Sequence, residues 1–157
     1  MLIYLVTIYQ SGKNPDRLLK VGNKIEVDKW LPIFIEYPKY FPRVYRYGIM
    51  KDGVNRYVEV EKLNTKRVIE EWDIIDEYLD DTCDTSIMGI FRRQMHNIDV
   101  IRNKVAEKSE KVAKLLMDWV DFLEVIRHLL AENKLYADVH AGNFGYDKAG
   151  NKKCLDF

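Results

Sequence analysis

The chain has 157 residues, enough for one domain or for two small parts that share a core. Hydrophobic residues make up 47% of it and charged residues 32%, which excludes a disordered, collagen-like or low-complexity chain. The 25 basic residues balance 25 acidic ones, so no overall positive field favours nucleic acid, and we expect no nucleic-acid partner.

The first 63 residues have the pattern of a small antiparallel sheet with one helix. A helix is predicted from Lys24 towards Ile35, with Pro32 bending or breaking it. The turn Lys51-Asp52-Gly53 predicts a hairpin between the last two strands. Strands are predicted over residues 2–9, 18–21, 44–50 and 57–63.

After Leu63 the apolar residues recur with the period of a helix. Helices are predicted over 68–79, 88–107 and 112–130, with a polar loop over 80–86. A loop over 136–145 follows, together with two short strands at 144–146 and 153–156. The predicted fold class is therefore α+β, with a β-rich part over 1–63 and a helical part over 64–157.

Cysteine usage and hydropathy bear on the compartment. Cys83 and Cys154 form no CxxC pattern, which is typical of free thiols in a reducing compartment, so we expect a cytoplasmic protein. The three histidines are not spaced like zinc ligands. The apolar N-terminal stretch lacks a basic n-region and a cleavage site, and no apolar run approaches ~18 residues, so we expect no membrane association.

Charge is uneven along the chain. Residues 1–60 carry ten basic and six acidic residues, whereas residues 61–100 carry five and ten. The acidic middle segment fits either an ordinary solvated surface or a surface that faces a partner.

The most informative segment is YADVHAGNFGYDKAGNKKCLDF, over residues 136–157. Asp138 and Asn143 lie five positions apart in a loop after a long helix, and Asp156 follows thirteen positions later. Phosphoryl transfer needs a carboxylate for the acceptor hydroxyl and oxygen ligands for magnesium. This pattern supplies both, although Asp138 and Asn143 could also be turn residues that bond their own backbone, and Asp156 a plain polar residue.

The motif DVHAGN resembles the DxHxGN loop of aminoglycoside and choline kinase relatives in the protein-kinase-like superfamily, and LDF resembles the first part of its DFG segment. The resemblance implies that Asp138 is the catalytic base and that Asn143 and Asp156 are magnesium ligands. It also implies that His140 lies near the transferred phosphate and that ATP and Mg²⁺ are the cofactors. Tyr136 stands where the family usually has a histidine.

The resemblance also implies that the N-terminal part is a reduced nucleotide-binding lobe. Lys20 would hold the α- and β-phosphates, with Glu26 as its partner and Glu36 as a second option. The backbone of Glu61 to Leu63 would face the adenine edge. An exposed strand lysine and an ordinary strand end are the simpler interpretations of these positions.

The chain departs from the family in two ways. None of its glycines forms GxGxxG, and the resemblance covers only the front part of a kinase, so the expected fold is a minimal, truncated one. Three interpretations remain: an active phosphotransferase, a degenerate pseudokinase-like module that regulates a protein partner, and a purely structural domain. Compact chains of this kind are typical of bacteriophage genomes, which would suit a host-directed regulator. The incomplete helical part predicts a protein partner or a homodimer.

Overall fold

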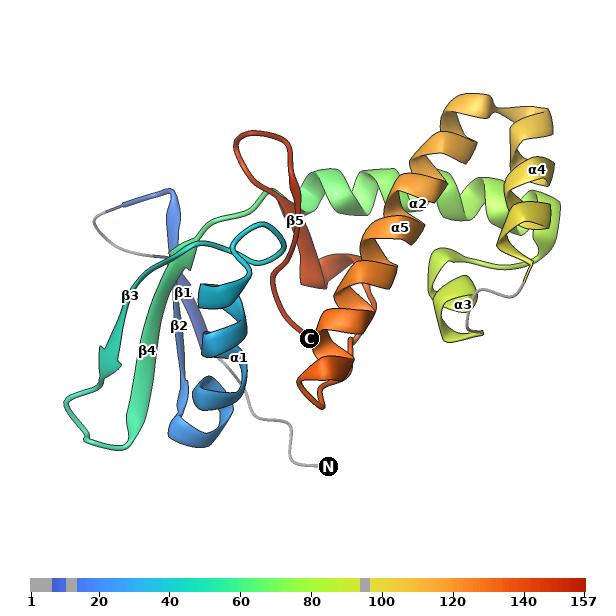
Figure 1. Ribbon diagram of the computed structural model, residues 1–157. Coiled ribbons are helices and arrows are strands. Elements are labelled where there is room, and N and C mark those ends of the chain that lie inside the picture. The colour runs from blue at the N-terminus through green and yellow to red at the C-terminus, as the bar shows by residue number, and fades with distance from the viewer. Residues whose placement is uncertain (1–6, 11–13, 94–96) are drawn as a thin grey trace. The chain divides into compact units, whose positions relative to one another are not determined.

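The computed structural model describes residues 7–10, 14–93 and 97–157, with side chains from residue 14 onwards (Figure 1). It is an α+β fold with a small antiparallel sheet, as the sequence predicts. The chain divides into two compact units, which are Met1–Asn64 with Tyr146–Leu155 and Thr65–Gly145 with Asp156–Phe157. Within the described residues, no helix is long and apolar enough to cross a membrane.

The first unit is built on a four-stranded antiparallel sheet in the order β1-β2-β4-β3. The predicted hairpin between the last two strands is confirmed, and of the strand predicted over 2–9, residues 2–6 lie outside the described residues. Helix α1 packs against one face of the sheet (Figure 1). The strands are β1 (Thr7–Gln10), β2 (Arg17–Asn23), β3 (Val44–Ile49) and β4 (Asn55–Glu61).

Helix α1 spans Lys24–Glu36 and starts where the sequence predicts. The side chain of Asn23 caps it by accepting a hydrogen bond from the Glu26 backbone N–H at 2.9 Å. Pro32 lies inside the helix, which continues past it for one more turn, although proline removes one backbone donor. The residues that α1 buries are Val27, Trp30, Ile33 and Phe34.

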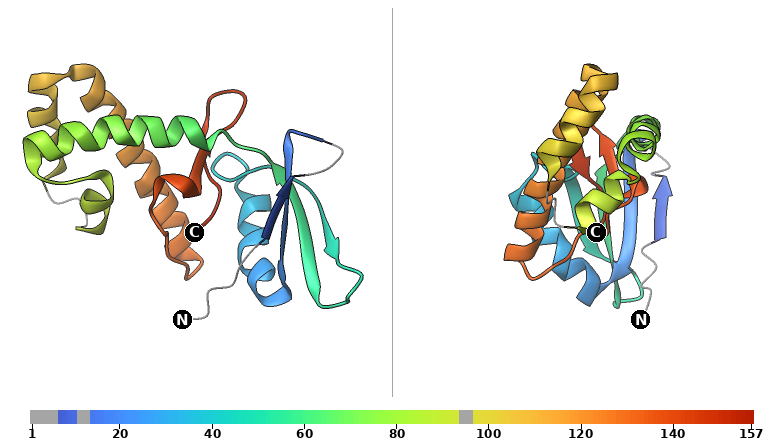
Figure 2. Two further views of the ribbon diagram at one scale, coloured as in Figure 1. Left: turned by 180° about the vertical axis from the view of Figure 1, so that it is seen from behind. Right: turned by 90° about the vertical axis from the view of Figure 1, so that its right-hand side faces the viewer.

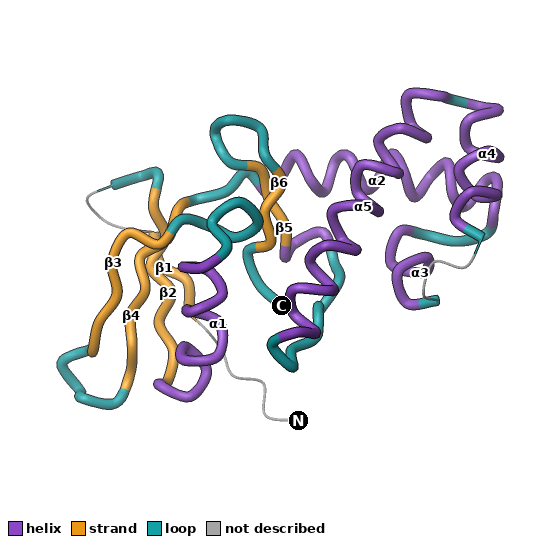
Figure 3. Tube along the Cα trace, in the orientation of Figure 1, coloured by secondary structure: helices purple, strands orange, loops and turns teal. Residues whose placement is uncertain are grey.

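A second, two-stranded hairpin is formed by β5 (Phe144–Tyr146) and β6 (Lys152–Cys154), shown in Figure 3. Backbone hydrogen bonds join Tyr146 to Asn64 at 2.8 and 3.1 Å, and the Cys154 N–H donates to the Tyr40 carbonyl at 2.8 Å. Residues 146–155 therefore belong to the first unit. The strand predicted over 153–156 is shorter, because β6 ends at Cys154.

The second unit is helical, and its helices follow one another from green to orange in Figure 2. The single helix predicted over 88–107 is wrong. One helix ends at Arg92, with Arg93 as its C-cap, and the next helix begins after Asn97. Asn97 has a φ of 70°, in the left-handed region, which interrupts a helix. The polar segment predicted as a loop from residue 80 remains helical as far as Cys83. The helices are α2 (Thr65–Cys83), α3 (Ile87–Arg92), α4 (Ile98–Lys108) and α5 (Glu110–Glu132).

Aromatic rings form the centre of the second unit. Trp72 of α2 and Trp119 of α5 meet edge to face with ring centres 5.4 Å apart. Phe144 packs against both, at 5.7 Å from Trp72 and 6.1 Å from Trp119. The Trp119 indole N–H donates to the Glu71 carboxylate at 3.0 Å, which satisfies this buried donor. These contacts fix the start of β5 against the two longest helices.

Candidate active site

The loop with the DVHAGN motif begins where α5 ends. Lys134 has a φ of 59°, and the Leu135 N–H bonds back to the Leu130 carbonyl at 2.8 Å, which closes the helix. The chain then alternates: the Val139 side chain is buried, whereas those of Asp138 and His140 are exposed. This alternation anchors the loop through Val139 and presents the two polar side chains to solvent.

Hydrogen bonds join the three motif residues within the second unit. The Asn143 side-chain amide donates from Nδ2 to the Asp138 backbone carbonyl at 2.8 Å. The Asp156 backbone N–H donates to the Asn143 carbonyl at 3.4 Å. The structure therefore brings together Asp138, Asn143 and Asp156, which are distributed over nineteen residues of sequence.

The bond from Asn143 Nδ2 also fixes the direction of its amide group. Only the amide nitrogen can donate to a carbonyl, so the amide oxygen Oδ1 is the atom left with acceptor capacity for a cation. The short 3-10 helix Ala141–Asn143 and the fully buried Phe144 hold the backbone on either side. The position of Asn143 is thus set by packing and by hydrogen bonds together.

Asp138 and His140 face each other across the turn. His140 Nε2 lies 3.6 Å from Asp138 Oδ2, and the Asp138 side chain is 71% exposed. A Cβ atom at Gly142 would lie 3.1 Å from the His140 ring, so glycine lets the imidazole lie across the backbone. This close approach gives the glycine of the motif a physical role.

Metal binding at this loop would depend on mixed ligands. Among the described side chains, no group of three or more His, Cys, Asp or Glu residues is arranged to hold a metal ion. The candidate ligand set combines the Asp156 carboxylate with the amide oxygen of Asn143, while the Asp138 carboxylate is assigned to the catalytic base. Carboxylate and amide oxygens are the ligands that Mg²⁺ accepts, usually with waters and phosphates completing its shell.

Lys20 lies in the middle of β2 and is almost fully buried. Its Nζ donates to the Leu155 carbonyl at 3.0 Å and lies 4.7 Å from the centre of the Trp30 ring. It is therefore not the exposed strand lysine of the simpler interpretation. Glu26, which the sequence pairs with it, has its carboxylate 3.5 Å from the Lys29 ammonium.

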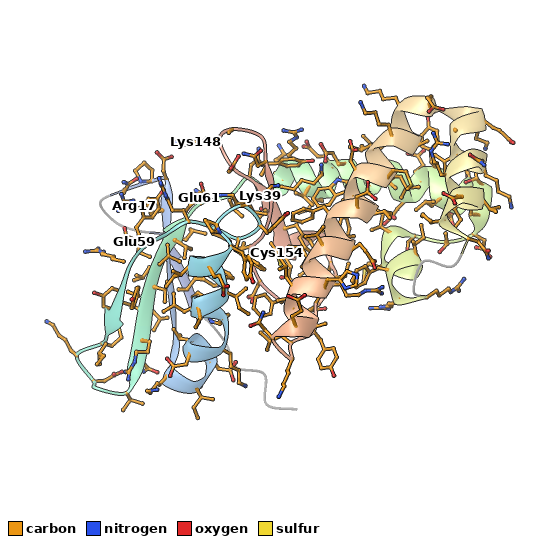
Figure 4. The ribbon with its side chains drawn as sticks, in the orientation of Figure 1. Arg17, Lys39, Glu59, Glu61, Lys148 and Cys154 are labelled. Carbon is orange, nitrogen blue, oxygen red and sulfur yellow. The ribbon has the colours of Figure 1, made fainter. Side chains whose placement is uncertain are left out.

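Glu61, at the end of β4, is engaged on both its backbone and its side chain. Its N–H donates to the Arg43 carbonyl at 2.9 Å, and its carboxylate accepts from Lys153 Nζ at 2.7 Å. Glu61 is labelled in Figure 4. Leu63, the other residue assigned to adenine, has a buried side chain. The Glu61 contacts connect the end of β4 to β6.

Lys153 is a residue that sequence reasoning missed. It is buried and lies between the carboxylates of Glu61 and Asp147, the latter at 3.5 Å. Burial raises the pKa of Asp147, but the hydrogen bonds from Asn151 and the Lys153 charge outweigh it, so the pKa is lowered overall. Two adjacent lysines at 152 and 153 gave no sequence signal that one of them would be buried.

No protein-family model matches this chain, and neither does any curated protein or any solved structure. What indicates a function is therefore the motif itself, the hydrogen bonds that join its residues, and the buried lysine of β2.

Proposed function

We propose that the chain is a kinase-like phosphotransferase that moves the γ-phosphate of ATP to a hydroxyl acceptor with the help of Mg²⁺. The observation that carries the proposal is the pair of hydrogen bonds that joins Asp138, Asn143 and Asp156. The backbone bond at 3.4 Å places Asp156 beside Asn143, although a hairpin separates the two residues in the sequence.

The proposed roles follow from the chemistry of each group. The exposed Asp138 carboxylate accepts the proton of the acceptor hydroxyl as its oxygen bonds to the γ-phosphorus and the bond to ADP breaks. Asn143 Oδ1 and the Asp156 carboxylate would hold the magnesium ion, which would neutralise charge on the phosphates. His140, beside Asp138, donates a hydrogen bond to the transferred phosphoryl group.

The nucleotide contacts assigned to the first unit belong to the same proposal. Lys20 supplies an ammonium to the α- and β-phosphates, with Glu26 on the neighbouring helix as its acidic partner. The Glu61 N–H is bonded to Arg43, so the adenine edge is left to the backbone of Leu63 rather than to that of Glu61.

A second candidate is a degenerate module that regulates a protein partner without catalysis. The Lys20 bond to the Leu155 carbonyl and the Glu26 pair with Lys29 favour it, because both side chains have structural contacts of their own. The sequence also lacks the GxGxxG loop that covers the phosphates in protein kinases.

Thermal unfolding of the full chain with ATP, with and without Mg²⁺, tests the proposal. A ligand at one hundred times its Kd adds about 2.7 kcal/mol to the free energy of unfolding. We expect Mg²⁺ to increase the stabilisation by ATP, Asp156→Asn to remove this increase, and Asp138→Asn to retain it. Asp121→Asn, an exposed change on α5, is the matched control.

Turnover is followed as ADP release, with water as the default acceptor. We expect Asp138→Asn and Asp156→Asn to abolish it, while Asp121→Asn leaves it unchanged. If ATP with Mg²⁺ gives neither stabilisation nor ADP release, the phosphotransferase is refuted, and the regulatory module and the purely structural domain are left.

A further inference from the structure

The strand β3 forms one edge of the four-stranded sheet. The Met50 N–H donates to the Asn55 carbonyl at 2.8 Å, so residues 50 and 55 are a hydrogen-bonded pair of the β3–β4 ladder. Hydrogen-bonded and non-bonded pairs alternate in an antiparallel ladder. Tyr47 and Ile49 therefore direct their backbone N–H and C=O groups away from β4, towards an edge that no described strand covers.

The side chains at this edge are large and apolar. Tyr47 is 58% exposed and Ile49 is 62% exposed. Next to them, a cavity of about 250 Å³ opens between β3 and α1, with Val27 and Leu31 on its helix side. An unpaired strand edge with exposed apolar side chains is a template for pairing with another strand.

We propose that a second copy of this chain pairs with the edge, β3 against β3 and antiparallel, about a two-fold axis at Gly48. Only residues that face outward can bond to each other across such a pair, and this axis places Tyr47 opposite Ile49 of the second copy. Each copy then contributes both residues, which gives two hydrogen-bonded pairs. Exposed aromatic and β-branched side chains become cross-strand neighbours.

Charge argues against the registers with the axis at Arg46 or Tyr47, whereas an axis at Ile49 would place Tyr47 opposite Lys51, which lies in the turn after β3. An axis at Arg46 would place the two Arg46 side chains opposite each other, and an axis at Tyr47 would place Arg43 opposite Lys51 of the second copy. Like charges directly opposite are destabilising. With the axis at Gly48, Arg46 lies opposite Met50, so no like charges meet.

Gly48 itself suits the centre of such an interface. A Cβ atom there would meet the Tyr57 ring at 2.9 Å, so the glycine leaves room for that ring beside the backbone at the axis. Arg46, the nearest charge, is already compensated, because its guanidinium pairs with the buried Glu59 carboxylate. The strand is thus self-complementary in shape and in charge.

Sedimentation velocity on the full chain over a wide range of concentration tests this pairing. We expect a monomer–dimer equilibrium that the double variant Tyr47→Lys with Ile49→Lys weakens at least about tenfold, because lysines then face each other in both pairs. The double variant Tyr47→Lys with Ile49→Glu restores the dimer, since the two introduced charges face each other only with the axis at Gly48. Ile25→Lys, on a residue of α1 that is 70% exposed, is the control and leaves the dimer unchanged.

Circular dichroism confirms that each variant is folded before its association is compared. A wild-type chain that stays monomeric at every concentration overturns the proposal and leaves an extended segment of another protein as the occupant of this edge. A dimer that both lysines leave intact, or one that the lysine–glutamate variant fails to restore, overturns the register. This inference is independent of ATP binding and of turnover.

Discussion

Replacement of Phe144 by alanine tests whether the ring cluster holds the motif loop in place. The Phe144 ring is fully buried and packs against Trp72, Trp119 and Phe122 with centre distances of 5.7, 6.1 and 6.1 Å. Deletion of a buried phenyl ring costs about 3–5 kcal/mol. Three ring contacts place Phe144 at the upper end of that range, because each aromatic pair contributes about 0.5–1.5 kcal/mol beyond area burial.

We therefore expect Phe144→Ala to lower the free energy of unfolding of the second unit by about 4–5 kcal/mol. Urea denaturation followed by tryptophan fluorescence measures this, since Trp72 and Trp119 report on the second unit. Phe144→Leu keeps most of the apolar volume and is the control, with an expected loss of about 1–2 kcal/mol. A loss below about 1 kcal/mol for the alanine variant would refute the packing argument for the position of Asn143.

Three further predictions concern stability. Pro32→Ala restores a backbone donor inside α1, and we expect a gain of up to about 3 kcal/mol in the first unit, measured by urea denaturation. Burial raises the pKa of Asp76, so the wild type should lose stability as pH rises through that raised pKa; Asp76→Asn should remove this loss in thermal melts at several pH values. The pKa of Asp147 is lowered, so its pH effect on stability has the opposite sign. Its stabilising contribution is present above the ordinary aspartate pKa and is lost as pH falls through the lowered pKa. Asp147→Asn should therefore reduce the loss of stability at acidic pH.

Each of these predictions can fail in a distinct way. A Pro32→Ala variant that is no more stable would mean that the helix geometry around the proline is held by other packing. An Asp76→Asn variant whose melting temperature keeps the wild-type pH dependence would rule out burial of that carboxylate as the cause. If Asp147→Asn leaves the acid sensitivity unchanged, the contact of Asp147 with Lys153 is ruled out as its cause.

The strands and helices were predictable wherever one local signal dominated. The hairpin at Asp52 formed as expected because its carboxylate accepts from the Val54 and Asn55 N–H groups, each at 2.9 Å, which also lowers the pKa of Asp52. The break between α3 and α4 was missed, because an asparagine in the left-handed region gives no signal in the apolar periodicity. Local propensity ranks Asn97 only slightly below its neighbours.

The sequence indicated which residues of the motif segment would lie near one another, and their chemical role stays a prediction. The spacing of Asp138, Asn143 and Asp156 indicated a shared site, and hydrogen bonds do join them. The contact between Lys20 and the Leu155 carbonyl joins residues 135 positions apart, and no local pattern encodes it. Side-chain partners over such separations depend on the assembled fold rather than on sequence spacing.

The C-terminal hairpin has a consequence for how the chain folds. Residues 146–155 belong to the first unit, while the residues on both sides of them belong to the second, so the chain passes between the units three times. Pairing Tyr146 with Asn64 closes a long loop, and such non-local contacts form slowly. During synthesis, Lys20 and Glu61 of the N-terminal sheet can bond to Leu155 and Lys153 only after almost the whole chain has been made. No single cut would release either unit in one intact piece, because each unit is built from two separate segments of the chain.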